Sequence, residues 1–197
     1  MTVPFKVVIP ARYSSARLPG KPLIKLAGKP MIAHVCERAV ESGAEQIVVA
    51  TDDQRIFDVV NDLGVEVKMT AKSHQSGTER IAEVAQIYKW KKNDIVVNLQ
   101  GDEPLLPGEY IKRVAEAISE NSGINVATLA SEISNDDEIF NSNIVKVVLD
   151  KKDYALYFSR APIPWDRKAF ENRVIKDISL KNLTGYLRHI EIGRAHV

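Results

Sequence analysis

Short apolar runs alternate with helical patterns through the first 121 residues, and this alternation narrows the possible folds more than any other feature. The apolar runs predict strands at residues 5–9, 46–50, 65–69 and 94–99. Apolar residues at helical spacing follow them at residues 31–40, 55–63, 78–88 and 107–121. The strands lack polar alternation, as expected of a parallel sheet covered on both faces. The order predicts a doubly wound α/β fold with a mostly parallel sheet and right-handed crossovers.

The pattern changes after residue 121, where short strands follow one another with little helix between them. Strands are predicted at residues 126–129, 144–149 and 155–158. The last two suggest a hairpin across the turn at residues 150–153. This part is expected to add an antiparallel extension to the sheet or a small flap.

Length, charge and cysteine content restrict the class of protein. A chain of 197 residues can bury one sizeable core, so one domain is expected. The formal net charge of +1 argues against a protein built for generic nucleic-acid binding. Cys36 is the single cysteine, which excludes an internal disulfide and suits a reducing compartment. The first apolar run is too short for a signal peptide or a membrane span, so a cytoplasmic protein without a membrane partner is expected.

Polar segments directly follow three of the predicted strands, at residues 10–22, 51–53 and 100–104. Open α/β sheets bind ligands beyond the carboxyl ends of their strands. These three segments therefore predict a shared site.

The segment at residues 10–22 combines small residues with three cations, Arg12, Arg17 and Lys21. Such a loop can hold a triphosphate through backbone N–H groups and charge-assisted hydrogen bonds. It matches neither a Walker A loop nor the dinucleotide-binding fingerprint. Composition alone supports a phosphate-binding loop and a solvated basic loop equally.

An ordered set of strings closely resembles the CMP-sugar-acid synthetases, and among them the enzymes that act on 3-deoxy-manno-octulosonate (Kdo). The strings are Val7–Tyr13, Arg17–Leu23, Ala50–Asp52, His74–Glu83, Val97–Pro104, Val145–Val148, Ala155–Trp165 and Tyr186–Ile190. The resemblance implies a nucleotide-diphospho-sugar transferase-like fold, a Mg²⁺ cofactor and a homodimer. It also implies that CMP passes from CTP to Kdo with release of pyrophosphate, which activates Kdo for bacterial lipopolysaccharide.

The resemblance assigns roles around the end of the fourth strand. One carboxylate with triphosphate oxygens and waters can hold Mg²⁺, although an aspartate here could also cap the next turn. The family pattern favours Asp102 as the metal ligand and places Gln100 at the sugar-acid site. Arg12 and Lys21 are then expected to carry catalysis with Asp102, by positioning and neutralising the phosphates. No general base is evident.

The segment Ser76-Gly77-Thr78 opens the third helix and can contribute hydroxyls and amides to a cytosine pocket, while Ser76 or Thr78 could equally cap the helix. The resemblance favours the pocket. The predicted nucleotide-binding residues are Pro10, Ala11, Arg12, Arg17, Lys21, Thr51, Ser76, Gly77, Thr78 and Arg80. Arg160 and His189 are expected to bind the sugar acid, whose carboxylate needs a cationic partner.

The resemblance stops at the end of the chain, where Glu191 and Gly193 replace the glycine and tyrosine of the family pattern. Residues 1–190 are therefore expected to form a single cytidylyltransferase domain that is incomplete at its C-terminus. Residues 191–197 are expected to be a non-native tail, and the chain by itself is expected to be inactive.

Other functions remain open from the sequence. Within enzymes these are a CMP-sialate or 8-amino-Kdo synthetase, a nucleoside-diphosphate-sugar pyrophosphorylase and a metal-dependent glycosyltransferase. In a different class, the chain could be a nucleotide-binding module without catalysis.

Overall fold

The computed structural model describes residues 3–14, 18–121, 123–167 and 185–194. They form two compact units, which are described separately: residues up to 128 together with 191–194, and residues 129–190.

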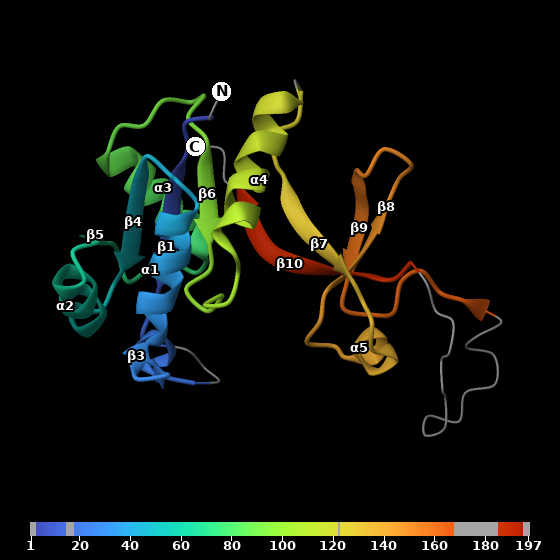
Figure 1. The fold of residues 1–197 in the computed structure, drawn as a ribbon, viewed down its shortest axis with the longest axis horizontal. Coiled ribbons are helices and arrows are strands. Elements are labelled where there is room, and N and C mark those ends of the chain that lie inside the picture. Colours follow the sequence, from blue (N-terminus) through green and yellow to red (C-terminus); the bar gives the residue numbers. More distant parts are fainter. Residues whose placement is uncertain (1–2, 15–17, 122, 168–184, 195–197) are drawn as a thin grey trace. The chain divides into compact units, whose positions relative to one another are not determined.

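A parallel sheet forms the centre of the first unit (Figure 1). Its strands are β1 (Lys6–Ala11), β4 (Gln46–Thr51), β5 (Glu66–Met69) and β6 (Val96–Leu99). They lie in the order β5-β4-β1-β6, and each neighbouring pair is parallel. The predicted parallel α/β sheet is confirmed.

Helices cover both faces of this sheet. They are α1 (Met31–Glu41), α2 (Gln54–Asp62), α3 (Gly77–Ile87) and α4 (Gly108–Glu120). The chain leaves β1 through α1 toward β4, but it returns from β5 through α3 to the other side of β1. Right-handed crossovers in opposite directions place α1 and α3 on opposite faces, which makes the fold doubly wound.

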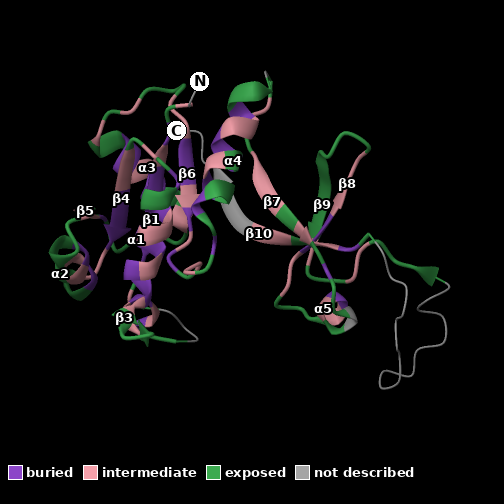
Figure 2. Cartoon of the chain, in the orientation of Figure 1, coloured by how far each residue is buried: buried purple, intermediate pink, exposed green. Residues whose placement is uncertain are grey.

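The core lies where α3 packs on the sheet. Val8, Val48 and Val96 from three strands meet Ile81 and Val84 from α3, and all five are fully buried. Figure 2 shows β1 and β4 as largely buried strands between the helices. Burial on both faces explains why these strands are apolar without alternation.

Close packing of α1 against α4 depends on one glycine. A Cβ added to Gly108 would lie 2.7 Å from backbone atoms of Glu41 and Ser42, where α1 ends. Such a distance is far below van der Waals contact, so any side chain here would push the two helices apart.

Three short elements between β1 and α1 were not predicted: η1 (Lys21–Leu23), a 3-10 turn, and the two-residue strands β2 (Lys25–Leu26) and β3 (Lys29–Pro30). They are too short to show a periodic pattern in the sequence.

The second unit is built mainly from antiparallel strands. Its elements are β7 (Thr128–Glu132), α5 (Asp136–Phe140), β8 (Lys146–Leu149), β9 (Ala155–Ser159) and the first half of β10 (Leu187–Arg194). The predicted hairpin is confirmed: β8 pairs antiparallel with β9, and the Asp150 N–H donates to the Tyr154 carbonyl at 2.8 Å. β7 and β8 begin two residues later than predicted, and α5 and β10 were not predicted.

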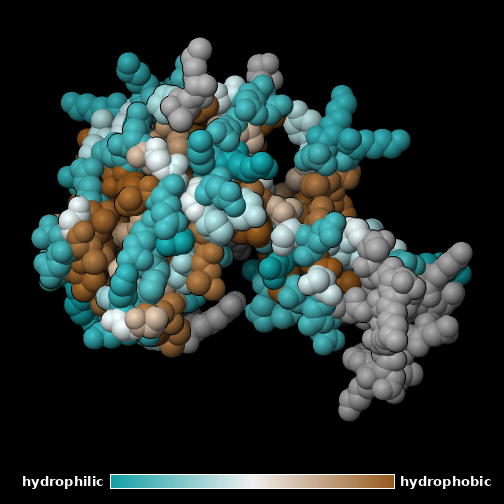
Figure 3. Space-filling model, viewed as in Figure 1, coloured by the Kyte–Doolittle hydropathy of each residue, from teal (hydrophilic) through white to brown (hydrophobic). Residues whose placement is uncertain are grey.

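The β8–β9 hairpin exposes apolar side chains, which Figure 3 shows as hydrophobic surface. Leu156 is 67%, Tyr157 62% and Phe158 41% exposed. Among the described strands β9 pairs with β8 alone, so it lies at the edge of the sheet that these strands form.

β10 contributes to both units. Leu187 and Arg188 pair with β8, and residues 192–194 pair antiparallel with β6. Residues 191–194 form the end of this strand, and the expectation that residues 191–197 are a non-native tail stays a prediction. The prediction of a single domain over residues 1–190 stays a prediction. None of the helices in the described ranges is both long and apolar enough to span a membrane.

Candidate functional site

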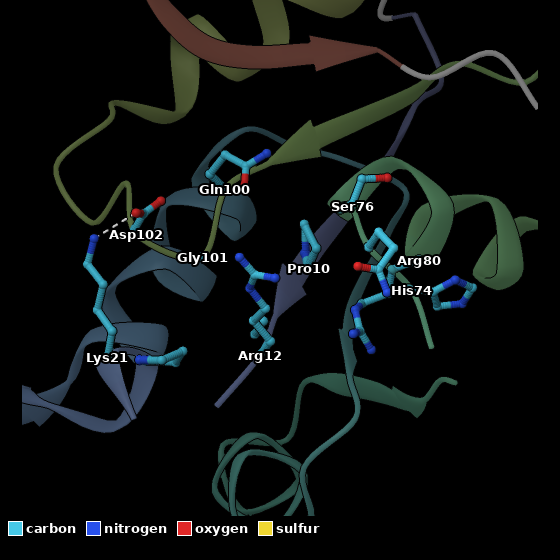
Figure 4. Close-up of a pocket in the computed structure, with 13 residues that line it drawn as sticks. Pro10, Arg12, Lys21, His74, Ser76, Arg80, Gln100, Gly101 and Asp102 are labelled. Atoms are coloured by element: carbon cyan, nitrogen blue, oxygen red, sulfur yellow. Dashed lines mark hydrogen bonds and ion pairs between the residues drawn. The ribbon is translucent and has the colours of Figure 1, made fainter. Parts of the chain in front are cut away.

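A cavity of about 270 Å³ opens in the first unit where β1 and β6 end and α3 begins (Figure 4). The strand order reverses here, because β4 and β5 lie on one side of β1 and β6 on the other. Open α/β sheets bind ligands at this switch point. The cavity is lined by Pro10, Ala11, Arg12, Lys21, Pro22, His74, Gln75, Ser76, Gly77, Arg80, Gln100, Gly101 and Asp102.

Two glycines allow the walls of the cavity to approach Pro10. A Cβ at Gly101 would lie 3.0 Å from the Pro10 carbonyl oxygen, and a Cβ at Gly77 would lie 3.2 Å from Pro10 Cγ. Larger residues would separate the end of β1 from β6 and α3. Gln100 lines the same wall, and its amide Nε2 donates to Asn98 Oδ1 at 3.3 Å.

Lys21 and Asp102 form an ion pair at one end of the cavity (Figure 4). Lys21 Nζ lies 2.7 Å from Asp102 Oδ2, and both side chains are partly exposed. Gly20 turns the chain just before Lys21, with a φ of 71° and an N–H that donates to the Tyr13 carbonyl. The predicted phosphate-binding cation and the predicted metal ligand therefore neutralise each other.

Arg12 follows β1 and lies between Lys21 and Ser76 in the view of Figure 4. Its side chain is exposed, and none of the described residues forms a hydrogen bond or an ion pair with its guanidinium. It is therefore available to an anionic ligand.

Ser76 caps α3 at another wall of the cavity. Its Oγ accepts a hydrogen bond from the Glu79 N–H at 3.2 Å, and Glu79 Oε2 accepts one from the Gln75 N–H at 2.7 Å. Cap and cavity residue are compatible roles, because the Ser76 hydroxyl can still donate. The Ser76 side chain can therefore cap α3 and contact a bound base at the same time.

Arg80 lines the cavity but is nearly fully buried, and its guanidinium is already paired. Its Nη2 lies 2.8 Å from Asp52 Oδ2, and its Nη1 donates to the Thr70 hydroxyl. Thr70 in turn donates from its hydroxyl (3.0 Å) and its N–H (2.9 Å) to the Thr51 carbonyl. Arg80 thereby joins α3 to the ends of β4 and β5.

His74 also lines the cavity, although no role was predicted for it. Its Nε2 lies 2.5 Å from Glu83 Oε2, which also accepts from the Ala71 N–H at 2.9 Å. Burial raises the pKa of Glu83, but these hydrogen bonds and the charges of His74 and Arg80 outweigh it and hold that pKa below its ordinary value. The sequence signal that could have pointed to His74 was its place at the start of the string His74–Glu83, which resembles the family pattern.

The other predicted nucleotide-binding residues differ in position. Thr51 and Thr78 do not line the cavity. Thr51 is buried, and its Oγ1 accepts from the Asp53 N–H at 3.2 Å. Arg17 lies outside the described residues.

The predicted sugar-acid residues Arg160 and His189 lie in the second unit. Arg160 is exposed, and its Nη1 donates to the carbonyls of Ser142 (2.8 Å) and Asn143 (3.3 Å). The His189 ring packs edge-on against Phe158, with 4.9 Å between ring centroids.

Among the described residues, no three His, Cys, Asp or Glu side chains gather into a metal site. Asp102 is the one carboxylate among the described residues that line the cavity. A cation here would therefore need further oxygen ligands from a bound molecule, as Mg²⁺ commonly has with nucleotides.

Comparison with known proteins matches the chain along nearly its whole length. The family model described as "Cytidylyltransferase" matches residues 6–196. A 3-deoxy-manno-octulosonate cytidylyltransferase of Thioalkalivibrio sulfidiphilus is 54% identical over 186 residues, which are 94% of this chain and 72% of that protein. One of Coxiella burnetii is 50% identical over 188 residues, 95% of this chain and 74% of that protein.

A solved structure is also similar, that of CMP:2-keto-3-deoxy-manno-octonic acid synthetase complexed with CTP. It superposes with a TM-score of 0.83 at 40% identity, over 98% of this chain and 74% of that one. The family match, the identities and the shared fold agree: the chain belongs to the cytidylyltransferase family, among the 3-deoxy-manno-octulosonate cytidylyltransferases.

Proposed function

We propose that the enzyme represented by this chain transfers CMP from CTP to Kdo and releases pyrophosphate. The observation that carries this proposal is the match to a CTP-complexed synthetase that covers 98% of the chain. The anomeric hydroxyl of Kdo loses its proton to solvent and its oxygen attacks the α-phosphorus. A C–O–P linkage forms as the P–O bond to the β-phosphate breaks, and pyrophosphate leaves. The product is activated Kdo for bacterial lipopolysaccharide.

The charges in the cavity support assigning the triphosphate to Arg12 and Lys21. Lys21 pairs with Asp102 at one end of the cavity, and Arg12 lies between that end and Ser76 in Figure 4. Pro10, Ala11, Ser76 and Gly77 are the lining residues assigned to the nucleoside. Arg17, Thr51, Thr78 and Arg80 are also proposed to contribute to nucleotide binding.

Asp102 is the residue proposed to hold Mg²⁺. The residues fit this ion, because a single partly exposed carboxylate beside phosphate-binding cations can share an octahedral cation with phosphate oxygens. Mg²⁺ supplies neutralisation of the charge on the phosphates. Arg12, Lys21 and Asp102 then position the triphosphate for attack.

Gln100, Arg160 and His189 are proposed to bind the sugar acid. Gln100 lines the cavity, and Arg160 leaves guanidinium N–H groups beyond Nη1 for a carboxylate.

The full-length enzyme is proposed to be a cytoplasmic homodimer with no nucleic-acid or membrane partner. The exposed apolar side chains of β9 and its unpaired edge support an interface between copies. The buried free thiol of Cys36 is consistent with a reducing compartment.

Pyrophosphate release on mixing CTP, Kdo and Mg²⁺ tests the proposed reaction, with UTP, sialate and 8-amino-Kdo as competing substrates. We expect release with CTP and Kdo and much less with the others. Release with sialate but not with Kdo would show that sialate, rather than Kdo, is the acceptor substrate. CTP binding by calorimetry without release from the full-length protein would favour a nucleotide-binding module.

A further inference from the structure

The cationic groups of the cavity differ in how they are neutralised. On one side, Lys21 is balanced only by Asp102, whose side chain is 48% exposed. Arg12 has no partner among the described residues. This side can therefore take up an anion at little cost, because exposed ion pairs are weak.

On the other side, Arg80 is held in place by buried partners. The Arg80 side chain is 4% exposed and that of Asp52 13%, and their 2.8 Å contact is reinforced by Thr70. A buried ion pair is costly to break, because either charge would remain uncompensated. Figure 4 shows Arg80 beside His74 and Ser76, away from Lys21 and Asp102.

His74, next to Arg80, is paired in the same way with Glu83. Arg80 and His74 lie on the wall formed by the start of α3 and the residues just before it (the α3 wall), and each has a carboxylate partner, Asp52 or Glu83, that does not line the cavity. The wall offers hydrogen-bonding groups from Ser76 and Gly77 without a free positive charge.

We propose that Asp52 is a specificity-determining residue that neutralises Arg80 and so reserves the α3 wall for the uncharged base. This inference rests on the proposed function, because it takes the cavity to bind a nucleoside triphosphate. Without Asp52, the Arg80 guanidinium would offer charge-assisted hydrogen bonds to phosphate. The triphosphate could then bind at the α3 end of the cavity, where the base is proposed to lie.

The test is Asp52→Asn, titrated separately with inorganic tripolyphosphate and with cytidine by calorimetry in buffer without divalent cations. We expect the affinity for tripolyphosphate to rise about tenfold, as one charge-assisted bond would give, while cytidine binds more weakly. Opposite changes for the two ligands distinguish this role from simple loss of structure, which weakens both.

Asp53→Asn is the matched control. Asp53 neighbours Asp52, but its carboxylate binds Arg55 and not Arg80, through three hydrogen bonds of 3.0, 2.9 and 2.7 Å. We expect both affinities to stay within about twofold of wild type.

A double variant, Asp52→Asn with Arg80→Gln, decides the matter even if the single variant fails to fold. It removes both charges together, so it avoids an unpaired buried ion. We expect it to bind tripolyphosphate within about twofold of wild type. A tenfold or greater loss of tripolyphosphate affinity in the double variant would show that Arg80 is a phosphate ligand and would overturn the inference. The inference would also fail if the affinities of Asp52→Asn for tripolyphosphate and cytidine changed in the same direction or not at all. If the wild-type chain binds neither tripolyphosphate nor cytidine, the proposed function itself would be contradicted.

Discussion

At the scale of single residues, Lys21 and Asp102 form an ion pair with which a phosphate ligand would compete. Both side chains are partly exposed, so the pair contributes at most about 1 kcal/mol. A charge-assisted hydrogen bond from Lys21 to phosphate contributes about 1.5–3 kcal/mol. We therefore expect a triphosphate to displace Asp102 from Lys21 and to leave that carboxylate free for a cation.

The first prediction concerns the two cations of the phosphate end. Arg12→Ala or Lys21→Ala should weaken binding of CTP about tenfold or more but leave cytidine nearly unaffected, because only CTP carries the phosphates. Calorimetry with both ligands measures the difference. Lys25→Ala is the control, an exposed lysine that does not line the cavity. Equal losses for CTP and cytidine would contradict the assignment.

The second prediction concerns Asp102 as the proposed Mg²⁺ ligand. Asp102→Asn keeps the shape of the side chain but removes its charge, so CTP binding should no longer strengthen when Mg²⁺ is added. Pyrophosphate release by the full-length enzyme should also be lost. Glu109→Gln, in the first turn of α4 and outside the cavity lining, should behave as wild type. An unchanged Mg²⁺ dependence in Asp102→Asn would refute the role.

At the scale of elements, the start of α3 and the loop before it form one cavity wall, and side chains of α3 hold that loop in place. Glu79 and Ser76 satisfy the N–H groups of its start. Glu83, one turn on, binds His74 and the Ala71 N–H, which fixes the loop before the helix. The capping signal was visible in the sequence, but the partners of Glu83 depend on the fold of that loop.

The third prediction follows from the lowered pKa of Glu83. The ionised carboxylate makes the stabilising contacts, so its contribution is complete above the ordinary glutamate pKa of 4.5 and is lost as the pH falls through the lower pKa of the folded state. Glu83→Gln should lower the free energy of unfolding by about 2 kcal/mol at pH 7.

Urea unfolding at a series of pH values measures this effect. The difference between wild type and Glu83→Gln should shrink as the pH is lowered from 5 toward 3. A difference that stays constant over this range would show that the charge of Glu83 does not stabilise the fold.

At the scale of the whole molecule, the two units differ in how they are held together. The described apolar residues buried in the second unit are few: Ile133, Ile139, Val147 and Tyr186. Small units with little apolar core depend on other contacts. The fully buried Lys146 supplies such contacts, because its Nζ donates to three carbonyls, those of Asn141 (2.9 Å), Ile144 (2.8 Å) and Arg160 (2.6 Å).

The fourth prediction tests this lysine. Lys146→Met keeps the length of the side chain but leaves three carbonyls without their donor, so the free energy of unfolding should fall by about 2–4 kcal/mol. Burial, with the nearby charge of Arg160, lowers the pKa of Lys146. Because the side chain has no contact with water, its hydrogen bonds to the three carbonyls hold Nζ in place. Lys152→Met, in the exposed turn of the hairpin, should change stability by no more than about 0.5 kcal/mol. A loss equally small at Lys146 would contradict the role.

The sequence by itself determined the parallel sheet, its helices and the edge at which the cavity forms. Buried strands, amphipathic helices and the hand of the crossovers are local or general properties, so a pattern of apolar residues is enough to predict them. The lining residues Arg12, Lys21, Ser76 and Asp102 follow from the same reasoning with the family resemblance.

Only the tertiary structure decided which charges meet. Lys21 pairs with Asp102 across 81 residues, and Arg80 pairs with Asp52 across 28. Side-chain pairing depends on distances of a few ångström between elements that are remote in sequence, and no periodicity encodes it. β10 was missed for a similar reason, because its pairing is set by partners in β6 and β8 rather than by its own pattern.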